Sequence, residues 1–227
     1  MSAMYSVSTS SIDERVSFIR KTYAHLLAAV FAFIGLEVLL FQTGVAQTIA
    51  STMLGVSWLL VIGLFMAVGW GANWLAHQDT SPALQYLGLG LYVVIEAIIF
   101  VPMLYIAVHY SDPSVLPSAA VTTLVVFSGL TVAVFATKKD FSFMRTALVM
   151  GGFLGLGLII AATLFGFSLG LWFSVGMAVL AAGYVLYYTS NVLHHYHPGQ
   201  HVAASLALFS AVALLFWYIL RIFMDRR

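Results

Sequence analysis

Seven long runs of apolar residues limit what this chain can fold into. A helix of about 20 apolar residues crosses the roughly 30 Å hydrocarbon core of a bilayer. We place the runs at residues 22–41, 53–75, 83–108, 116–137, 144–165, 168–188 and 202–223. They are continuous and lack the polar alternation of a barrel wall. The sequence therefore predicts an all-α integral membrane protein, a bundle of seven transmembrane helices.

Composition agrees with this fold class and excludes several functions. The chain is 62% hydrophobic and 7% charged, whereas soluble domains carry about 25% charged residues. We expect a cytoplasmic N-terminal tail over residues 1–21 and one seven-span membrane domain over residues 22–227. A net charge of +1 offers no surface for nucleic acid. The chain has no cysteine and no P-loop, nucleophile elbow or zincin motif, so we expect no enzyme activity and no cofactor.

The basic residues predict the orientation. They form three clusters, which lie before the first run, between the fourth and fifth runs, and at the C-terminus. With seven spans the first two clusters face the same side, so the positive-inside rule places the N-terminus in the cytoplasm and the C-terminus outside. The last cluster, which includes Arg221, opposes this arrangement unless a late span only re-enters the membrane. We expect a multi-pass protein of the bacterial inner (plasma) membrane, in contact with the lipid bilayer.

Two carboxylates lie inside the apolar runs, and Glu96 is the more informative of them. It sits about midway along the third run, where an ionised carboxylate costs roughly 3 kcal/mol. Gln85 and Tyr92 share its helical face, so we predict an ion pathway through Glu96, Tyr92 and Gln85. The alternative is a structural hydrogen bond from a protonated carboxyl. Glu37 lies near the end of the first run, where we expect it to extend to the headgroups.

Two further patterns have both structural and functional interpretations. Histidines cluster in the loop from His194 to His201, where they form either a metal or pH-sensing site or a solvated loop; whether a metal binds is left open. Small residues recur at helical spacing, Gly151 with Gly155 and Gly170 with Ser174. This spacing favours close helix contacts.

Four stretches of the sequence resemble the Bax inhibitor-1 (transmembrane Bax inhibitor motif) family. They are FIRKTYAHL from Phe18, YVVIEAIIFVP from Tyr92, the segment from Thr122 to Met144 that contains FATKKDFSFM, and YYTSNVLH from Tyr187. The resemblance implies a seven-helix bundle with one central helix. It also implies a pH-sensitive calcium leak, as in studied members, or modulation of stress responses or of a membrane protease.

The chain departs from the family at the proposed gate. In leak-forming members two carboxylates of the last two spans share protons and close the pore, with help from an arginine in the second span. Here Tyr188 and Phe209 stand at the acid positions, and the second span has no basic residue. Asn191 and Asp140 are the other family-motif positions that we assign to the gate.

Two hypotheses of function follow. The first is a slow cation leak, of calcium or protons, with Glu96 as the internal site. The second is a regulator of membrane-protein quality control or stress response that carries no ions and acts through a membrane protease or another membrane-protein partner. A secondary transporter would show internal repeats, and we find no clear repeat.

Overall fold

A computed structural model describes residues 6–7, 10–78 and 81–225 of the chain. Residues 1–5 and 8–9 of the predicted tail, and Arg226 and Arg227 of the last basic cluster, lie outside the described residues. The helices, in chain order, are α1 (Ile12–Gln42), α2 (Val45–Leu54), α3 (Trp58–Ala76), α4 (Pro82–Tyr110), α5 (Val115–Thr137), the short 3-10 helix η2 (Ser142–Met144), α6 (Arg145–Phe165), α7 (Gly170–His194) and α8 (His201–Asp225).

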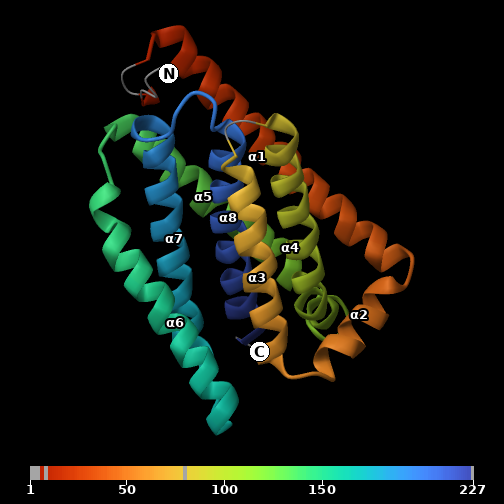
Figure 1. The fold of residues 1–227 in the computed structure, drawn as a ribbon. Coiled ribbons are helices and arrows are strands. Elements are labelled where there is room, and N and C mark those ends of the chain that lie inside the picture. The colour runs from red at the N-terminus through yellow and green to blue at the C-terminus, as the bar shows by residue number, and fades with distance from the viewer. Residues whose placement is uncertain (1–5, 8–9, 79–80, 226–227) are drawn as a thin grey trace.

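Seven of these helices are long and apolar enough to cross a membrane, as the sequence predicted. Figure 1 shows the beginning of α1 and the end of α8 at opposite ends of the bundle. An odd number of crossings requires this arrangement. Many large apolar side chains on the outer faces of α1, α3, α5 and α6 are exposed. These faces lie against lipid in a multi-pass membrane protein.

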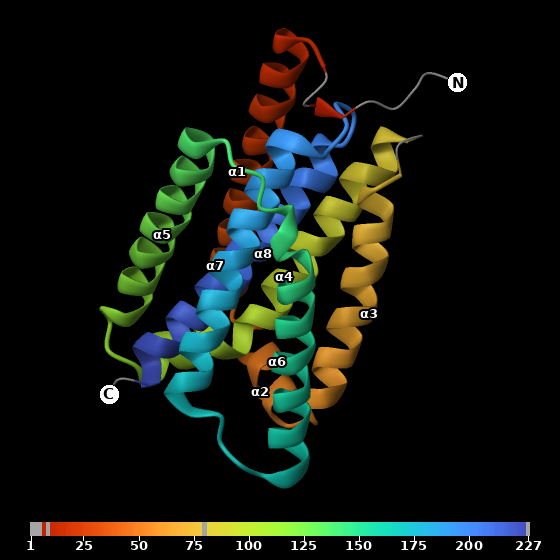
Figure 2. The ribbon, with the colours of Figure 1, turned by 90° about the vertical axis from the view of Figure 1, so that its left-hand side faces the viewer.

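The central helix is α8. It packs against α1, α3, α4, α5 and α7, and both ribbon views place it in the middle of the bundle (Figures 1 and 2). Small and branched residues such as Ala203, Ala204 and Leu208 are fully buried along its first half. The family resemblance implied a central helix, and packing assigns that position to the last helix of the chain.

The first helix begins earlier than the apolar run that predicted it. Ser11 caps it, because its hydroxyl accepts from the N–H of Glu14 while the Glu14 carboxylate accepts from the N–H of Ser11. This reciprocal capping box stabilises the first turn. The helix then runs unbroken to Gln42, so the predicted boundary at residue 21 falls inside α1. The separate helix α2 takes up the first residues that we had assigned to the second span.

Pro102 interrupts the hydrogen bonding of α4. Proline has no N–H for the carbonyl of Ile98 and usually bends a helix. The helix continues to Tyr110, but its C-terminal part runs across the bundle at a steep angle to its first part (Figure 2). The first part of α4 therefore crosses beside α3, and the second part lies against α2.

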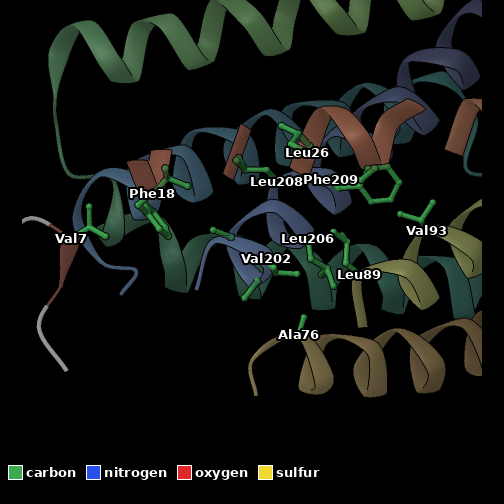
Figure 3. Close-up of a cluster of buried hydrophobic side chains, with 14 residues drawn as sticks. Val7, Phe18, Leu26, Ala76, Leu89, Val93, Val202, Leu206, Leu208 and Phe209 are labelled. Carbon is green, nitrogen blue, oxygen red and sulfur yellow. The ribbon is translucent and has the colours of Figure 1, made fainter. Parts of the chain in front are cut away.

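One core cluster joins the N-terminal end of α1 to α8. Phe18 and Leu26 of α1 belong to this cluster with Val202 and Leu208 of α8, and Leu206 lies beside Leu89 of α4 (Figure 3). The backbone also ties this end together, since the N–H of Val7 donates to the carbonyl of Tyr196 at 2.9 Å.

The small residues of α6 form the contact that the sequence predicted. A Cβ at Gly151 would lie 2.7 Å from Leu180 Cδ1, and one at Gly155 would lie 2.6 Å from Met177 Sδ. Both neighbours belong to α7, so the prediction is confirmed for this pair. It is wrong for Gly170, which has open space around it and a φ of +65°. Gly170 begins α7 in the left-handed region that glycine favours.

Candidate functional site

Glu96 lies in the first, straight part of α4 and is buried, with 5% of its surface exposed. Its Oε2 atom is buried and has no hydrogen-bond partner among the described residues. An unpaired polar atom in an apolar interior costs about 1–3 kcal/mol even when it is neutral. A ligand or ion that bonds to this oxygen would therefore be stabilised beside Glu96.

The Glu96 cavity is the space that this carboxyl lines. It measures about 470 Å³ and lies among α3, α4, α6, α7 and α8. Its walls are mostly apolar and aromatic, with Trp58, Phe65, Phe100, Tyr184, Trp217 and Tyr218 among them. Glu96 is the only carboxylate among the described residues that line it. The site thus combines one acidic group with an aromatic enclosure.

Two other cavities have more polar linings than the Glu96 cavity. They lie toward the end of the bundle where α1 begins. The Asn191 cavity, about 390 Å³, is lined by His77, Arg145, Asn191 and His195. The Tyr92 cavity, about 400 Å³, is lined by Tyr92, Ser210 and Asn73.

The three cavities share lining residues. Tyr184 lines both the Glu96 and the Asn191 cavities, Phe65 lines both the Glu96 and the Tyr92 cavities, and Tyr188 lines both polar cavities. These neighbouring cavities therefore lie along the α3 side of α7 and α8. They extend from the end of the bundle near Arg145 to the aromatic side chains around Glu96. We call this set of three cavities the crevice.

Two of the three residues predicted for the ion pathway line the crevice, and the third has another contact. Tyr92 lies one turn before Glu96 on α4, and its ring packs edge-on to Phe209 with the ring centroids 6.2 Å apart. Gln85 is buried near the start of α4. Its Nε2 donates to the carbonyl of Gln78, 3.1 Å away in the α3–α4 connection. The structure thus gives Gln85 a partner at the helix end, away from Glu96.

Glu37 does not extend to the headgroup region as we expected. Its side chain is buried in α1, and both carboxyl oxygens are without a hydrogen-bond partner among the described residues. The neighbours explain the difference, because one helical turn on either side of it Phe33 contacts Phe100 and Phe41 contacts Tyr105. Both partners belong to α4, so Glu37 faces α4 and not lipid. Glu37 is not among the residues that line the Glu96 cavity.

The four positions assigned to the gate lie in three different places. Tyr188 and Asn191 line the crevice on α7. Phe209 packs in the core beside Tyr92 and Phe33. Neither Tyr188 nor Phe209 carries an acid, so a shared-proton pair cannot form at these two positions.

Asp140 belongs to a cluster that joins the α5–α6 connection to the end of α7. Its Oδ2 lies 3.0 Å from Nε2 of His195, and its Oδ1 accepts from the N–H of Ser142 at 2.8 Å. The hydroxyl of Ser190 accepts from the N–H of Phe141 at 2.9 Å. We call Asp140, Ser190 and His195 the latch. His195 also lines the Asn191 cavity, so the latch borders the crevice.

The electrostatics of the latch favour an ionised carboxylate. Partial burial alone would raise the pKa of Asp140, but hydrogen bonds from the Ser142 N–H and from His195 lower that pKa to about 2. Sequence reasoning singled out Asp140 but missed its pairing with Ser190 and His195, although Asp140 and Ser190 both fall in stretches that carried the family resemblance. The partners are about 50 positions apart, so no local spacing could have found them.

The histidine loop shows no metal site among the residues that the structure describes. No group of three or more histidine, aspartate or glutamate side chains there is arranged to hold a metal ion. Its members separate: His195 turns to Asp140, whereas His201 packs against His25 with the ring centroids 5.0 Å apart.

The comparisons with known proteins agree with this architecture. The family described as "Inhibitor of apoptosis-promoting Bax1" matches residues 15–227. "Protein LIFEGUARD 4" of Arabidopsis thaliana is 27% identical over 97% of this chain and 90% of its own length. "Bax inhibitor 1" of Schizosaccharomyces pombe is 29% identical over 92% and 76%.

A bacterial relative matches over a shorter stretch. An uncharacterized protein of Pseudomonas aeruginosa is 33% identical over 48% of this chain, and the chain spans about half of that relative's length. No solved structure matches significantly. Because the family match covers nearly the whole chain and the seven-helix bundle agrees with it, the protein is a multi-pass membrane protein of the Bax inhibitor-1 family.

Proposed function

We propose that the protein is a slow cation leak through the crevice, with Glu96 as its internal site. The observation that carries this proposal is the unpaired Oε2 of Glu96, buried in a cavity that adjoins two more polar cavities. A carboxyl group within a membrane protein that faces such a space is typical of proton and ion pathways. One carboxylate suits a proton or a cation in transit better than tightly held calcium, which takes 6–8 oxygen ligands.

The proposed pathway begins at the Asn191 cavity, which we assign to the cytoplasmic side from the basic residues near it. It passes Tyr188 and Tyr92 and reaches Glu96. Beyond Glu96, Trp58 and Trp217 stack with their ring centroids 6.3 Å apart, and Phe100 lies edge-on to Trp217 at 5.0 Å. These rings give this part of the cavity an apolar lining, which suits a slow leak and not a wide, water-filled pore.

Flux into proteoliposomes tests the proposal. The purified chain is reconstituted, and calcium and proton entry are followed with entrapped indicator dyes. Glu96→Gln keeps the shape of the side chain and removes its ionisation. We expect the flux of the parent protein to exceed that of empty vesicles and to fall about tenfold in Glu96→Gln, the effect of losing about 1.4 kcal/mol at the rate-limiting barrier.

The matched control is Glu37→Gln. It removes the other buried carboxylate of the membrane domain but does not alter the Glu96 cavity, so it should keep the parent flux. Equal flux in empty and protein-containing vesicles would refute the leak. Equal loss in both glutamine variants would refute the assignment of Glu96.

The names of the relatives favour one second candidate. "Bax inhibitor 1" and the "Golgi anti-apoptotic protein" of vaccinia virus are named for inhibition of cell death and not for transport. The corresponding proposal here is a regulator that binds a membrane protease or another membrane protein. Crosslinking in native membranes should then recover a stoichiometric partner, and vesicles that contain the chain alone should show no flux.

A further inference from the structure

The Glu96 cavity has a lining suited to a particular class of ligand. Its volume of about 470 Å³ lies in the range of small-molecule sites, about 300–1,000 Å³. Trp58, Trp217 and Phe100 contribute ring faces and edges, and Glu96 contributes a buried carboxyl with an unpaired oxygen. An acidic group inside an aromatic enclosure is how proteins recognise organic ammonium ions.

The cavity also opens toward lipid. Three of its lining residues have large exposed side chains: Met66 of α3 is 49% exposed, and Val149 and Phe153 of α6 are 47% and 72% exposed. These residues belong to the lipid-facing surfaces of the two helices. An amphiphile dissolved in the bilayer can therefore enter between α3 and α6 without passing through water.

We propose that the Glu96 cavity binds amphiphilic organic cations, that is, ammonium compounds with an apolar body. The ammonium group pairs with the Glu96 carboxylate and lies against the rings of Trp58 and Trp217, while the apolar body fills the space toward Met66 and Phe153. This inference rests on the position of Glu96 in the cavity and stands whether or not ions leak through it.

Other ligand classes fit the cavity less well. A neutral amphiphile leaves Glu96 without an ionic partner. An anionic amphiphile meets a carboxylate and no cationic side chain, because Arg145 lines the neighbouring Asn191 cavity and not this one. A divalent metal ion finds one carboxylate and two phenol hydroxyls among the described lining side chains, fewer oxygens than such an ion takes.

Tryptophan fluorescence provides a direct readout, because two of the five tryptophans line the cavity. The others, Trp70, Trp74 and Trp172, are exposed and do not line this cavity; they are replaced by phenylalanine. The probe is 2-bromododecyltrimethylammonium, whose bromine lies beside the head group and quenches nearby indole rings. The matched probes are 2-bromododecanol and 2-bromododecanoate, which have the same tail and a neutral or anionic head. The protein is kept whole, in micelles of a neutral detergent.

We expect saturable quenching by the ammonium probe and weak, non-saturating quenching by the alcohol and the carboxylate. Glu96→Gln should raise the apparent Kd of the ammonium probe about tenfold, the effect of losing one ion pair worth about 1.4 kcal/mol. Glu96→Asp, which keeps the charge, should restore most of the binding. Glu37→Gln should bind like the parent. A helical circular dichroism spectrum like that of the parent protein checks that each variant is folded.

Equal quenching by the three probes, or an unchanged Kd in Glu96→Gln, would overturn the proposal. The outcome is separate from that of the flux experiment. Saturable binding without flux would refute the leak and support this binding site. Flux without binding would refute this binding site and support the leak.

Discussion

Gly88 sets the distance between α3 and α4, and replacing it tests how tightly these helices pack. A Cβ at this position would lie 2.5 Å from the carbonyl oxygen of Ala72 and 2.6 Å from the amide nitrogen of Ala76. Both are backbone atoms, so no side chain can rotate away. Ala72 and Ala76 are themselves fully buried. In Gly88→Ala the two helices must move apart.

The magnitude follows from two opposing effects. Overpacking a tight contact costs about 1–3 kcal/mol, and replacing glycine by alanine inside a helix returns up to about 1 kcal/mol. We therefore expect Gly88→Ala to lower the free energy of unfolding by about 1–2 kcal/mol. Gly90, two residues further along the same helix, has open space where its Cβ would be. Gly90→Ala should leave stability unchanged or raise it by up to about 1 kcal/mol.

Unfolding in mixed detergent micelles, followed by circular dichroism, measures both variants against the parent. The comparison separates steric crowding from helix propensity, because the chemical change is the same at both positions. If Gly88→Ala and Gly90→Ala unfold with the same free energy, the close α3–α4 approach does not exist in the protein.

Two further predictions concern the latch. Because its pKa is lowered from 3.8 to about 2 in the folded state, ionised Asp140 stabilises the fold above about pH 4, and this contribution is lost as the pH falls toward 2. Asp140→Asn should therefore flatten the pH dependence of the unfolding free energy over that window, and an unchanged profile would contradict the assignment. Ser190→Ala removes the acceptor for the Phe141 N–H, which should cost about 1 kcal/mol and speed hydrogen exchange of that amide. Thr137→Ala, which removes a hydroxyl bonded only within its own helix, should leave that exchange unchanged.

Much of the architecture could be predicted from the residues. Each membrane span requires a minimum length of apolar sequence, so counting along the chain placed most of the seven spans within a few residues of the observed helices. The exceptions are α1, which begins ten residues earlier at Ile12, the second span, whose start belongs to α2, and α7, which runs on to His194. Burial of Glu96 could also be predicted, because a carboxylate in the middle of an apolar run has few stable locations other than the interior. The Gly151 and Gly155 contact followed from helical spacing alone.

The features that could not be predicted from the sequence depend on which faces of different helices pack together. Glu37 resembles an interfacial carboxylate in the sequence, but packing of Phe33 and Phe41 against α4 turns it inward. Gln85 shares a helical face with Glu96 by spacing, yet the α3–α4 connection supplies it with a different partner. The meeting of Asp140 with His195, 55 positions away, depends on how the end of α7 docks against the α5–α6 connection. Hydropathy and helical periodicity describe one helix at a time, so they determined the spans and the buried carboxylate, whereas the crevice, the latch and the central place of α8 arose only when the side chains of different helices packed together.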